Sequence, residues 1–240
     1  MGKNIPKVLV GAPVSNMHAY CIKEFLTAIK SFTYPNYDIL LVDNSKTNTF
    51  YNQIKDQAPI VRMPYELRAR ERVTNAHNLL RDKALKEKYD YLFILDQDVL
   101  PPERAIEVLI SRNKKAIAGL YFGNHTLPDG TNAVMPFAWR FTQKVHDWTQ
   151  TRYLNQEEIW QPGLIKIAFA GGGCILLHRD ILEKIKFRYD ASMDAWDDRW
   201  LGYDIYDKGL EFYLDNTIKC RHLYLNRPFS WETIKKLGLN

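Results

Sequence analysis

The sequence contains few cysteines, and none of them are paired at the spacing of a metal or redox motif. Cys21, Cys174 and Cys220 are an odd number, and each lies far along the chain from the others. Disulfide-rich secreted domains and zinc ribbons need paired cysteines at short spacing, so the pattern excludes both classes. Unpaired thiols are typical of a reducing compartment, and we therefore expect a cytoplasmic location.

Long hydrophobic runs are also missing. The first apolar stretch leads to Gly11 and Pro13 and to no small-residue cleavage site, which argues against a secretory signal peptide. The longest later stretch, residues 165–177, is interrupted by Lys166 and by three glycines, and it falls short of the ~20 residues that span a bilayer. We expect no transmembrane segment, and peripheral docking on a membrane stays open.

The charge balance shows only a small excess of one sign. Thirty-three Lys and Arg residues stand against 28 Asp and Glu residues, a formal net charge of +5. This excess suits an anionic ligand such as a polyphosphate, but it is too weak for a nucleic-acid-binding surface, so we expect no nucleic-acid partner. A content of 46% hydrophobic and 25% charged residues excludes disordered and fibrous classes. The sequence leaves the oligomeric state open.

Apolar segments of strand length alternate with segments of helical periodicity. In the first part of the chain, strands are predicted over residues 7–11, 38–42, 58–62 and 91–95, and helices over 18–32, 66–88 and after Pro101 and Pro102. Strands that are apolar throughout, alternating with helices, indicate a mostly parallel, mixed central sheet with helices on both faces. No segment has the composition of a linker, so we expect one α/β domain over residues 1–240.

The second half of the chain has weaker periodicity. Residues 123–164 contain many turn-forming and aromatic residues, and we expect long loops there, with one hairpin at most. Strands are then predicted over 165–169, 174–177, 211–214 and 217–221, and helices over 179–187 and 200–209, the last one closed by Gly209.

Two carboxylates follow a buried strand: Asp96 and Asp98 flank Gln97 directly after residues 91–95. Ligands of open parallel sheets gather at the carboxyl ends of strands. Two carboxylates at such a place suit Mg²⁺ or Mn²⁺ that also binds substrate phosphates. The alternative is a solvated turn, because Asp is a common turn residue, but the position after five apolar residues favours the metal site.

The segment around this acidic pair, residues 78–102, resembles the helix, strand and DxD motif of GT-A glycosyltransferases of the family-2 type. Further segments that resemble the family follow in the expected order: 8–13, 41–45, 170–179 and 197–205. The resemblance covers residues 7–122 and 165–222. It implies a Rossmann-like GT-A domain whose residues 1–122 bind a UDP- or GDP-sugar, and whose residues 123–240 bind a hydroxyl acceptor, which is a glycan, a lipid-linked molecule or a small molecule. The activity implied is that of a hexosyltransferase.

The resemblance also implies donor-binding residues. Ala12 and Pro13 match the turn that contacts the base, and Asp43 with Asn44 matches the segment that holds the nucleobase or ribose. Asp96 is expected to contact the donor as well as the metal. The small-residue loop beside the donor sugar is matched by Gly171, Gly172 and Gly173.

Two residues of the long helix are candidates for further donor contacts. A guanidinium at Arg72 would serve a diphosphate, although a solvated helix face is the alternative. Asn78 either contacts the donor or packs against the strand that carries the acidic pair. His77 stands where the family often has Arg.

A third metal ligand follows from the resemblance. His222 sits where many family members have one, which gives the set Asp96, Asp98 and His222. Asp and His together are compatible with Mn²⁺, and a metal there would stabilise charge on the departing nucleotide. The alternative is a partly buried histidine at a strand end.

The acceptor side of the resemblance rests on residues 197–205. Asp204 matches the Asp of the family's Glu-Asp motif and is the predicted general base of an inverting displacement, whereas Tyr203 replaces the usual acid. Acceptor binding is expected from Trp196, Asp197 and Asp198, and the two aspartates are the next candidates for the base. A surface ion pair between Asp204 and Lys208 is the alternative.

Other classes of protein share parts of this pattern. Haloacid-dehalogenase-type phosphohydrolases also place two Asp residues after a strand, and Asp96 would then be the nucleophile and Asp98 the acid/base. Their motif usually lies on an early strand, which disfavours this alternative. A non-catalytic, metal-dependent sugar-binding module stays open. Residues 11–16 lack GxGxxG, which disfavours a dinucleotide dehydrogenase still more strongly.

Overall fold

The computed structural model describes residues 5–126, 130–142, 150–192 and 195–224. An eight-stranded sheet forms its centre. From one edge to the other, the strands are β11 (Leu164–Ile167), β14 (Phe212–Lys219), β6 (Ala116–Leu120), β13 (Cys174–His178), β4 (Tyr91–Leu95), β1 (Val8–Val14), β2 (Tyr37–Asp43) and β3 (Ile60–Arg62). β13 runs antiparallel to both of its neighbours and β11 runs antiparallel to β14, whereas the remaining pairs are parallel. The predicted mixed, mostly parallel sheet is confirmed.

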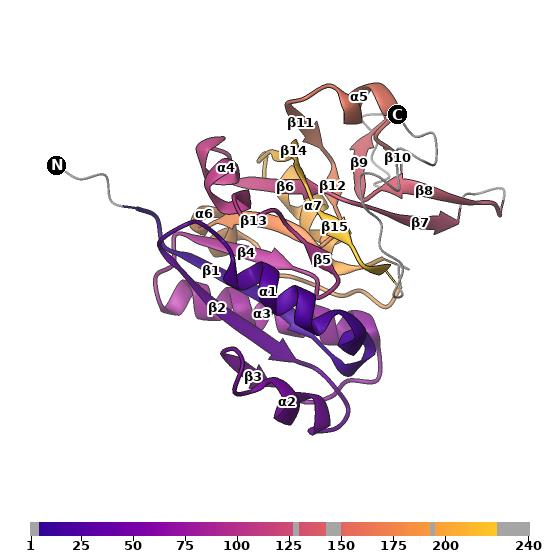
Figure 1. The fold of residues 1–240 in the computed structure, drawn as a ribbon. Coiled ribbons are helices and arrows are strands. Elements are labelled where there is room, and N and C mark those ends of the chain that lie inside the picture. Colours follow the sequence, from indigo (N-terminus) through magenta and orange to yellow (C-terminus); the bar gives the residue numbers. More distant parts are fainter. Residues whose placement is uncertain (1–4, 127–129, 143–149, 193–194, 225–240) are drawn as a thin grey trace.

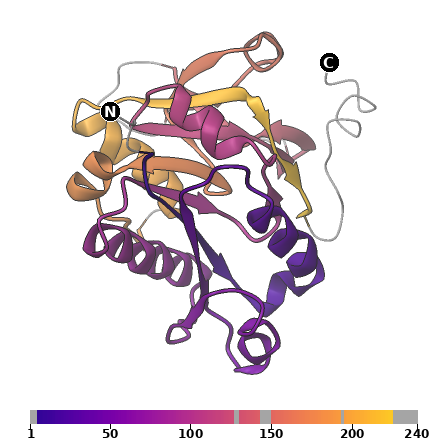
Figure 2. The same cartoon turned by 60° about the vertical axis from the view of Figure 1, so that its left-hand side comes forward.

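Alternate residues of the buried strands supply two separate cores. In β1, for example, Val8 and Val10 face one side of the sheet and Leu9 faces the other. The first face is covered by α1 (Ile22–Lys30), α2 (Thr49–Ile54) and α4 (Ala105–Ser111), and the second by α3 (Ala69–Lys86), α6 (Arg179–Lys184) and α7 (Asp197–Asp207). Figures 1 and 2 show α1 and α3 on opposite sides of the sheet. Helices on both faces were predicted, and this arrangement is confirmed.

Smaller sheets lie beside the central one. β7 (Phe122–Thr126) and β8 (Asn132–Pro136) form a hairpin, and β9 (Ala138–Phe141) pairs with β10 (Thr151–Tyr153) and β12 (Phe169–Ala170). A short antiparallel pair joins β5 (Val99–Leu100) to β15 (Arg221–His222). This last pair brings the segment after Asp98 against the segment that contains His222, so two distant parts of the sequence meet at the end of β4.

The observed elements differ from the predicted ones in several places. The helix expected over 18–32 is a 3-10 helix over Asn16–Cys21, with a non-helical backbone inside it at His18, followed by α1. Residues 123–164 form strands and a short helix, α5 (Gln156–Trp160), instead of long loops; residues 127–129 and 143–149 of this segment lie outside the described residues. The two strands predicted over 211–214 and 217–221 are one strand, β14, followed by β15. The helix expected from Trp200 begins at Asp197.

No helix among the described residues is long and apolar enough to cross a membrane. The strands β1, β2 and β4 end at Val14, Asp43 and Leu95. Because these three strands are parallel neighbours, the residues that follow them gather at one edge of the sheet.

Candidate active site

A cavity of about 350 Å³ lies at this edge of the sheet. The loops after β1, β2 and β4, the first turns of α3 and α7, and β15 all contribute to its walls. Its polar lining residues are Ser15, His18, Asn44, Arg72, His77, Asp96, Gln97, Asp98, Asp197, Asp198 and His222. Aromatic side chains, Tyr121, Phe137, Trp196 and Tyr224, line it too. The cavity therefore combines a carboxylate-rich wall with aromatic surfaces.

Asp98 and His222 face each other across the β5–β15 pair. His222 Nε2 lies 3.3 Å from Asp98 Oδ2, and His222 Nδ1 donates a hydrogen bond to the Phe122 carbonyl oxygen at 2.7 Å. Burial acts to raise the pKa of Asp98, but the hydrogen bond and charge of His222 outweigh it and the pKa is lowered. Burial acts to lower the pKa of His222, and its contact with Asp98 raises it instead.

The tautomer of His222 bears on whether a metal fits here. Because a carbonyl oxygen only accepts hydrogen bonds, Nδ1 carries a hydrogen, and Nε2 is the nitrogen that faces the Asp98 carboxylate. A lone pair and a carboxylate oxygen would repel each other at this distance unless a proton or a metal ion lies between them. A nitrogen and an oxygen donor placed in this way fit a divalent cation. Among the described residues, no group of three or more such side chains converges.

Asp96 is the other carboxylate of the acidic pair, and its surroundings differ from those of Asp98. It points toward the glycine loop, where its Oδ1 atom is 3.8 Å from the position that a Cβ on Gly172 would occupy. Burial and the nearby charge of Asp98 raise the pKa of Asp96 to about 6, against the opposing charges of His77 and His222. Its role as a metal ligand stays a prediction.

Gln97 connects the acidic pair to the loop after β1. Its Oε1 accepts a hydrogen bond from the Ser15 backbone N–H at 2.8 Å, and its Nε2 donates one to the His18 carbonyl oxygen at 2.8 Å. The side chain between the two aspartates is thus used to hold Ser15 and His18 in the wall of the cavity. Nothing in the residue types around Gln97 indicated this.

Asp198 is placed by the N-terminus of α7. Its Oδ1 accepts from the Arg199 N–H at 2.6 Å, and its Oδ2 accepts from the Gly172 N–H at 3.1 Å. Burial, together with the neighbouring charges of Asp197 and Asp96, raises the pKa of Asp198 to about 7. A carboxylate with such a pKa is suited to take a proton near neutral pH.

Asp197 and His77 form a buried pair beside Asp198. His77 Nδ1 lies 2.7 Å from Asp197 Oδ2, and only 2% of the His77 surface is exposed. Burial acts to lower the pKa of His77, but the charge and hydrogen bond of Asp197 outweigh it and the pKa is raised. The pair holds one imidazole among the carboxylates of this wall.

A family model described as glycosyl transferase family 2 matches residues 12–186. The chain belongs to glycosyl transferase family 2. The predicted family is confirmed, and with it the prediction of a glycosyltransferase at the level of the family. This membership argues against the phosphohydrolase alternative. No curated protein sequence matches the chain.

Solved structures share the fold of this family 2 chain. A mannosyltransferase from Pyrobaculum calidifontis, in complex with GDP-Man and Mn²⁺, is 17% identical with a TM-score of 0.52, and the match covers 91% of this chain and 57% of that one. S. aureus TarS 1-349, in complex with UDP, is 12% identical with a TM-score of 0.50, and the match covers 87% of this chain and 57% of that one. The chain thus spans little more than half of these two structures, and the likeness confirms the predicted GT-A fold.

The cavity collects only some of the predicted donor-binding residues of this glycosyltransferase. Pro13, Asn44, Arg72, Asp96 and Gly172 line it. The Arg72 guanidinium donates to the carbonyl oxygens of Glu66 and Leu67, at 2.6 and 3.0 Å, and lies over the Tyr65 ring. These contacts hold the guanidinium against the loop before α3, in the wall of the cavity.

Three other residues that were predicted to bind the donor are not part of the cavity lining. Ala12 is buried in the core under α1. Asp43 Oδ1 accepts from the Ser45 N–H at 3.0 Å, and its Oδ2 lies 3.2 Å from Arg62 Nε. Asn78 exchanges two hydrogen bonds with the Phe187 backbone. None of these three residues lines the cavity, and their roles in donor binding stay predictions.

In the glycine loop, too, only some of the predicted residues line the cavity. A Cβ on Gly171 would overlap Tyr121 and Phe137, and a Cβ on Gly173 would lie 2.6 Å from Val99. The Gly173 N–H also donates to the Tyr121 hydroxyl at 3.1 Å. These two glycines are required by packing, and Gly172 is the member of the loop that lines the cavity.

On the acceptor side, the structure brings Trp196, Asp197 and Asp198 into the cavity wall, but it does not bring Asp204 there. Both Asp204 oxygens accept hydrogen bonds from the Arg188 guanidinium, at 2.9 and 3.0 Å, and Arg188 lies over the Trp200 ring. The predicted partner Lys208 is replaced by Arg188 in this ion pair. Trp196 is 43% exposed at the cavity, and its ring faces Arg70.

Several residues of the cavity were not predicted as site residues from the sequence, among them His18, His77, Tyr121 and Phe137. A signal existed for one of them, since His77 replaces an Arg of the family motif. For the others, tertiary contacts decide the position. Tyr121 and Phe137 stack with ring centroids 4.8 Å apart, and His222 packs edge-on against both.

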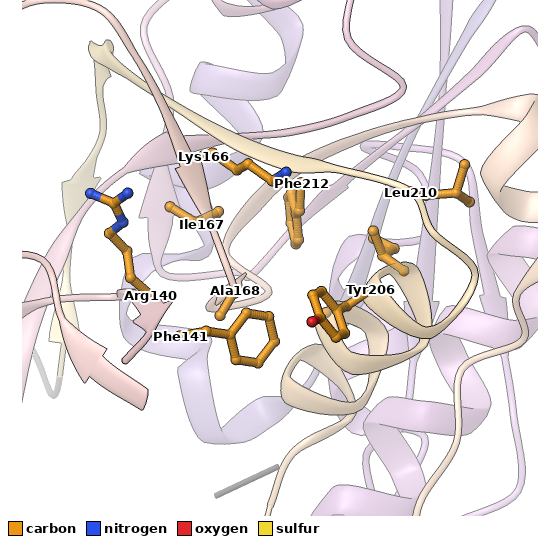
Figure 3. Close-up of a pocket in the computed structure, with 10 residues that line it drawn as sticks. Arg140, Phe141, Lys166, Ile167, Ala168, Tyr206, Leu210 and Phe212 are labelled. Atoms are coloured by element: carbon orange, nitrogen blue, oxygen red, sulfur yellow. The ribbon is translucent and has the colours of Figure 1, made fainter. Parts of the chain in front are cut away.

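A second, smaller cavity of about 170 Å³ lies farther along α7, where Gly202, Ile205 and Tyr206 line it (Figure 3). Apolar residues of β11, β14 and α7 form most of it, and Arg140 and Lys166 lie at its border. Those two cations are paired with Glu158 and Glu211. It contains none of the acidic or histidine side chains of the first cavity, and we therefore place the chemistry in the first one.

Proposed function

We propose that this chain transfers a sugar from a nucleoside-diphosphate donor to a hydroxyl acceptor, with a divalent cation and with inversion at the anomeric carbon. The observation that carries the proposal is the pairing of two unlike sites in one cavity: Asp98 with His222 on one wall, and Asp198 with its raised pKa on another. The first suits a cation and a diphosphate, and the second suits the acceptor. Membership of glycosyl transferase family 2 supports the transfer of a sugar.

Asp98 and His222 are the residues that would hold the cation, with Mn²⁺ or Mg²⁺ as the candidates. A divalent cation bound there would supply positive charge to the diphosphate as it departs. Asp96, beside Gly172, is left free to contact the donor itself. Gln97 keeps the loop after β1 in position for the nucleotide.

Asp198 is the proposed general base, in place of Asp204. The acceptor oxygen forms a bond to the anomeric carbon as the bond from that carbon to the diphosphate oxygen breaks, and the acceptor's proton passes to the Asp198 carboxylate. The leaving diphosphate takes the electron pair. Backbone N–H groups of Gly172 and Arg199 fix the orientation of the carboxylate, so little reorganisation is needed at the moment of transfer.

The donor nucleotide is proposed from the solved relatives. One of them binds GDP-Man with Mn²⁺ and another binds UDP, so GDP and UDP are the nucleotides to test first. The cytoplasm is the proposed compartment, because Cys21, Cys174 and Cys220 are free thiols.

The test is calorimetric titration of GDP and UDP in the presence of Mn²⁺. Asp98→Asn is expected to abolish the Mn²⁺-dependent part of the affinity, and His222→Ala to reduce it by less, because water can replace one ligand among several. Asp56→Asn removes an exposed carboxylate that does not line the cavity and serves as the control. Equal affinities in all four proteins would contradict the metal site. Binding of GDP-mannose and UDP-glucose without transfer or hydrolysis of either would favour a sugar-binding module.

A further inference from the structure

Tyr121 is a buried residue of the cavity wall whose hydroxyl has no part in the reaction proposed above. It lies at the junction of β6 and β7, and only 3% of its surface is exposed. Burial, together with the nearby charges of Asp96 and Asp198, raises the pKa of Tyr121 well above its ordinary value. The phenol is therefore neutral, and it acts through hydrogen bonding and packing.

The glycine loop closes around this hydroxyl. A Cβ on Gly171 would overlap the Tyr121 oxygen, and a Cβ on Gly173 would lie 2.9 Å from it. The Gly173 N–H donates a hydrogen bond to the same oxygen at 3.1 Å. Both glycines that packing requires, one on each side of Gly172, thus make room for the end of the Tyr121 side chain.

The ring and the backbone of Tyr121 are fixed as well. The ring stacks on Phe137, and the Phe137 N–H donates to the Tyr121 carbonyl oxygen at 3.0 Å. The Phe137 carbonyl oxygen accepts in turn from the Gly171 N–H at 3.0 Å. Three junctions, β6 to β7, β8 to β9 and β12 to β13, are therefore bound to one another, and the hydroxyl has a defined place inside the loop.

The loop binds carboxylate residues of the site on its other side. The Gly172 N–H donates to Asp198 Oδ2 at 3.1 Å, and the Gly173 carbonyl oxygen accepts from the Asp96 N–H at 3.4 Å. The Gly173 N–H lies between these two backbone groups along the chain, and its partner is the Tyr121 hydroxyl. Loss of the hydroxyl would leave this N–H without its partner, at the place where the loop holds Asp198.

We propose that Tyr121 is a positioning residue for the transfer step: its hydroxyl fixes the glycine loop, and the loop holds the Asp198 carboxylate where it takes the acceptor's proton. The proposal rests on the function proposed above, in which Asp198 is the general base. It adds that the rate of transfer depends on a side chain that carries no charge and transfers no proton.

The experiment uses Tyr121→Phe, which removes the hydroxyl and keeps the ring that stacks on Phe137. With water as the acceptor, the water oxygen bonds to the anomeric carbon, the bond from that carbon to the diphosphate oxygen breaks, and the water's proton passes to Asp198. Release of GDP from GDP-mannose and of UDP from UDP-glucose, with Mn²⁺, measures this step. Calorimetry gives the dissociation constants and binding stoichiometries of GDP and UDP.

Tyr34→Phe is the matched control. The Tyr34 hydroxyl donates to the Pro6 carbonyl oxygen at 2.6 Å, and the residue is buried but does not line the cavity. The control also loses one hydrogen bond of a buried tyrosine, and thermal unfolding compares the stability of the two variants.

We expect Tyr121→Phe to lower kcat by about tenfold or more, the scale of one hydrogen bond. The dissociation constants of GDP and UDP should stay within about twofold of wild type. Tyr34→Phe should keep the wild-type kcat. A Tyr121→Phe protein with the wild-type kcat, or with a kcat that falls only as far as its binding stoichiometry falls, overturns the inference while the proposed function stands.

The double variant tests the route through Asp198. With Asp198→Asn already in place, Tyr121→Phe should lower the rate by less than about twofold, because no base is left to be misplaced. Single-turnover measurements with the enzyme in excess make this slow rate accessible. An equal loss in both backgrounds overturns the inference. A wild-type chain that releases no nucleoside diphosphate from either sugar nucleotide overturns the proposed function and the inference with it.

Discussion

Asp198 and Asp204 lie on the same helix, yet they face different partners. Asp198 accepts two backbone hydrogen bonds in the cavity wall, and Asp204 is held by Arg188 outside it. Asp198→Asn removes the base and is expected to lower kcat by roughly 10²–10⁴-fold, the usual contribution of general base catalysis. Donor affinity should change only a few-fold. Steady-state kinetics with a calorimetric donor titration measure both, and Asp204→Asn is the matched control, expected to keep most of the rate. The reverse order of the two variants would return the base to Asp204.

The pH dependence of the reaction follows from the same carboxylate. Burial and two neighbouring carboxylates raise the pKa of Asp198 to about 7, so it is protonated and inactive as a base at lower pH. We expect kcat/KM to rise about tenfold for each pH unit below pH 7 and to level off above it. Asp198→Asn should lose this rise. A pH profile that is unchanged in the variant would show that another group titrates.

At the scale of elements, the close packing of α7 against β12 requires a glycine at position 202. A Cβ on Gly202 would overlap the Ala168 carbonyl oxygen and the Phe169 Cβ. Gly202→Ala is therefore expected to push α7 away from β12 and to move Asp197 and Asp198 with it, which lowers the melting temperature and kcat together. Asp207→Ala changes an exposed residue of the same helix and should leave both near wild type. Differential scanning calorimetry and initial rates test this, and an unaltered Gly202→Ala protein would contradict it.

The short helix α5 depends on a side chain from β14. The Asn216 amide donates to the carbonyl oxygens of Glu158, Ile159 and Gln161, and its oxygen accepts from the Gly163 N–H. Asn216→Ala leaves these buried groups without partners and should lower the free energy of unfolding by about 1–3 kcal/mol. Urea denaturation measures the change. Asn75→Ala, at an exposed position of α3, should stay within about 0.5 kcal/mol of wild type.

Local sequence patterns predicted the strands that are buried on both faces of the sheet. They failed for elements whose structure depends on contacts between distant parts of the chain. The strand before Asp96 was evident because every residue of Tyr91–Leu95 is apolar. A hairpin was expected within residues 123–164, but the strands β9 and β10 were missed because their side chains are mostly half-exposed and alternate weakly. In α7, the helix begins at Asp197, and its two acidic first-turn residues are a usual sign of a helix N-terminus. The predicted start at Trp200 leaves these two residues outside the helix, and Asp204 was predicted as the base from its match to the family's Glu-Asp motif.

In the candidate site, too, local sequence predicted some residues, and long-range contacts decided the others. Asp96 and Asp98 follow a strand in the sequence, so their place at the sheet edge was predictable. The pairing of β5 with β15 is a long-range contact, and only the family resemblance indicated His222. Gln97 and His77 have partners more than seventy positions away, at Ser15, His18 and Asp197, and no local pattern encodes such contacts.

At the scale of the whole molecule, the cavity joins segments from both ends of the chain. The loop after β1, the end of β4, the first turns of α3 and α7, and β15 meet only in the folded state. A nucleotide with Mn²⁺ that binds only this state should stabilise it by about 2.7 kcal/mol at 100 times its dissociation constant. A thermal-shift series with GDP and UDP should therefore raise the melting temperature of the wild type. Asp98→Asn should show no Mn²⁺-dependent increase, and an equal increase in this variant would contradict the proposed site.

The place of β13 in the sheet has a consequence for how the chain is made. β4 and β6 are consecutive along the chain among the strands of the central sheet, but they are not paired with each other; each is paired with β13, which lies between them. On the ribosome, both strands therefore keep an unpaired edge until residue 178 has emerged, and apolar edges of this kind invite pairing with other chains. We therefore expect β4 and β6 to be the segments of the central sheet most exposed to pairing with other chains during synthesis, until β13 joins them.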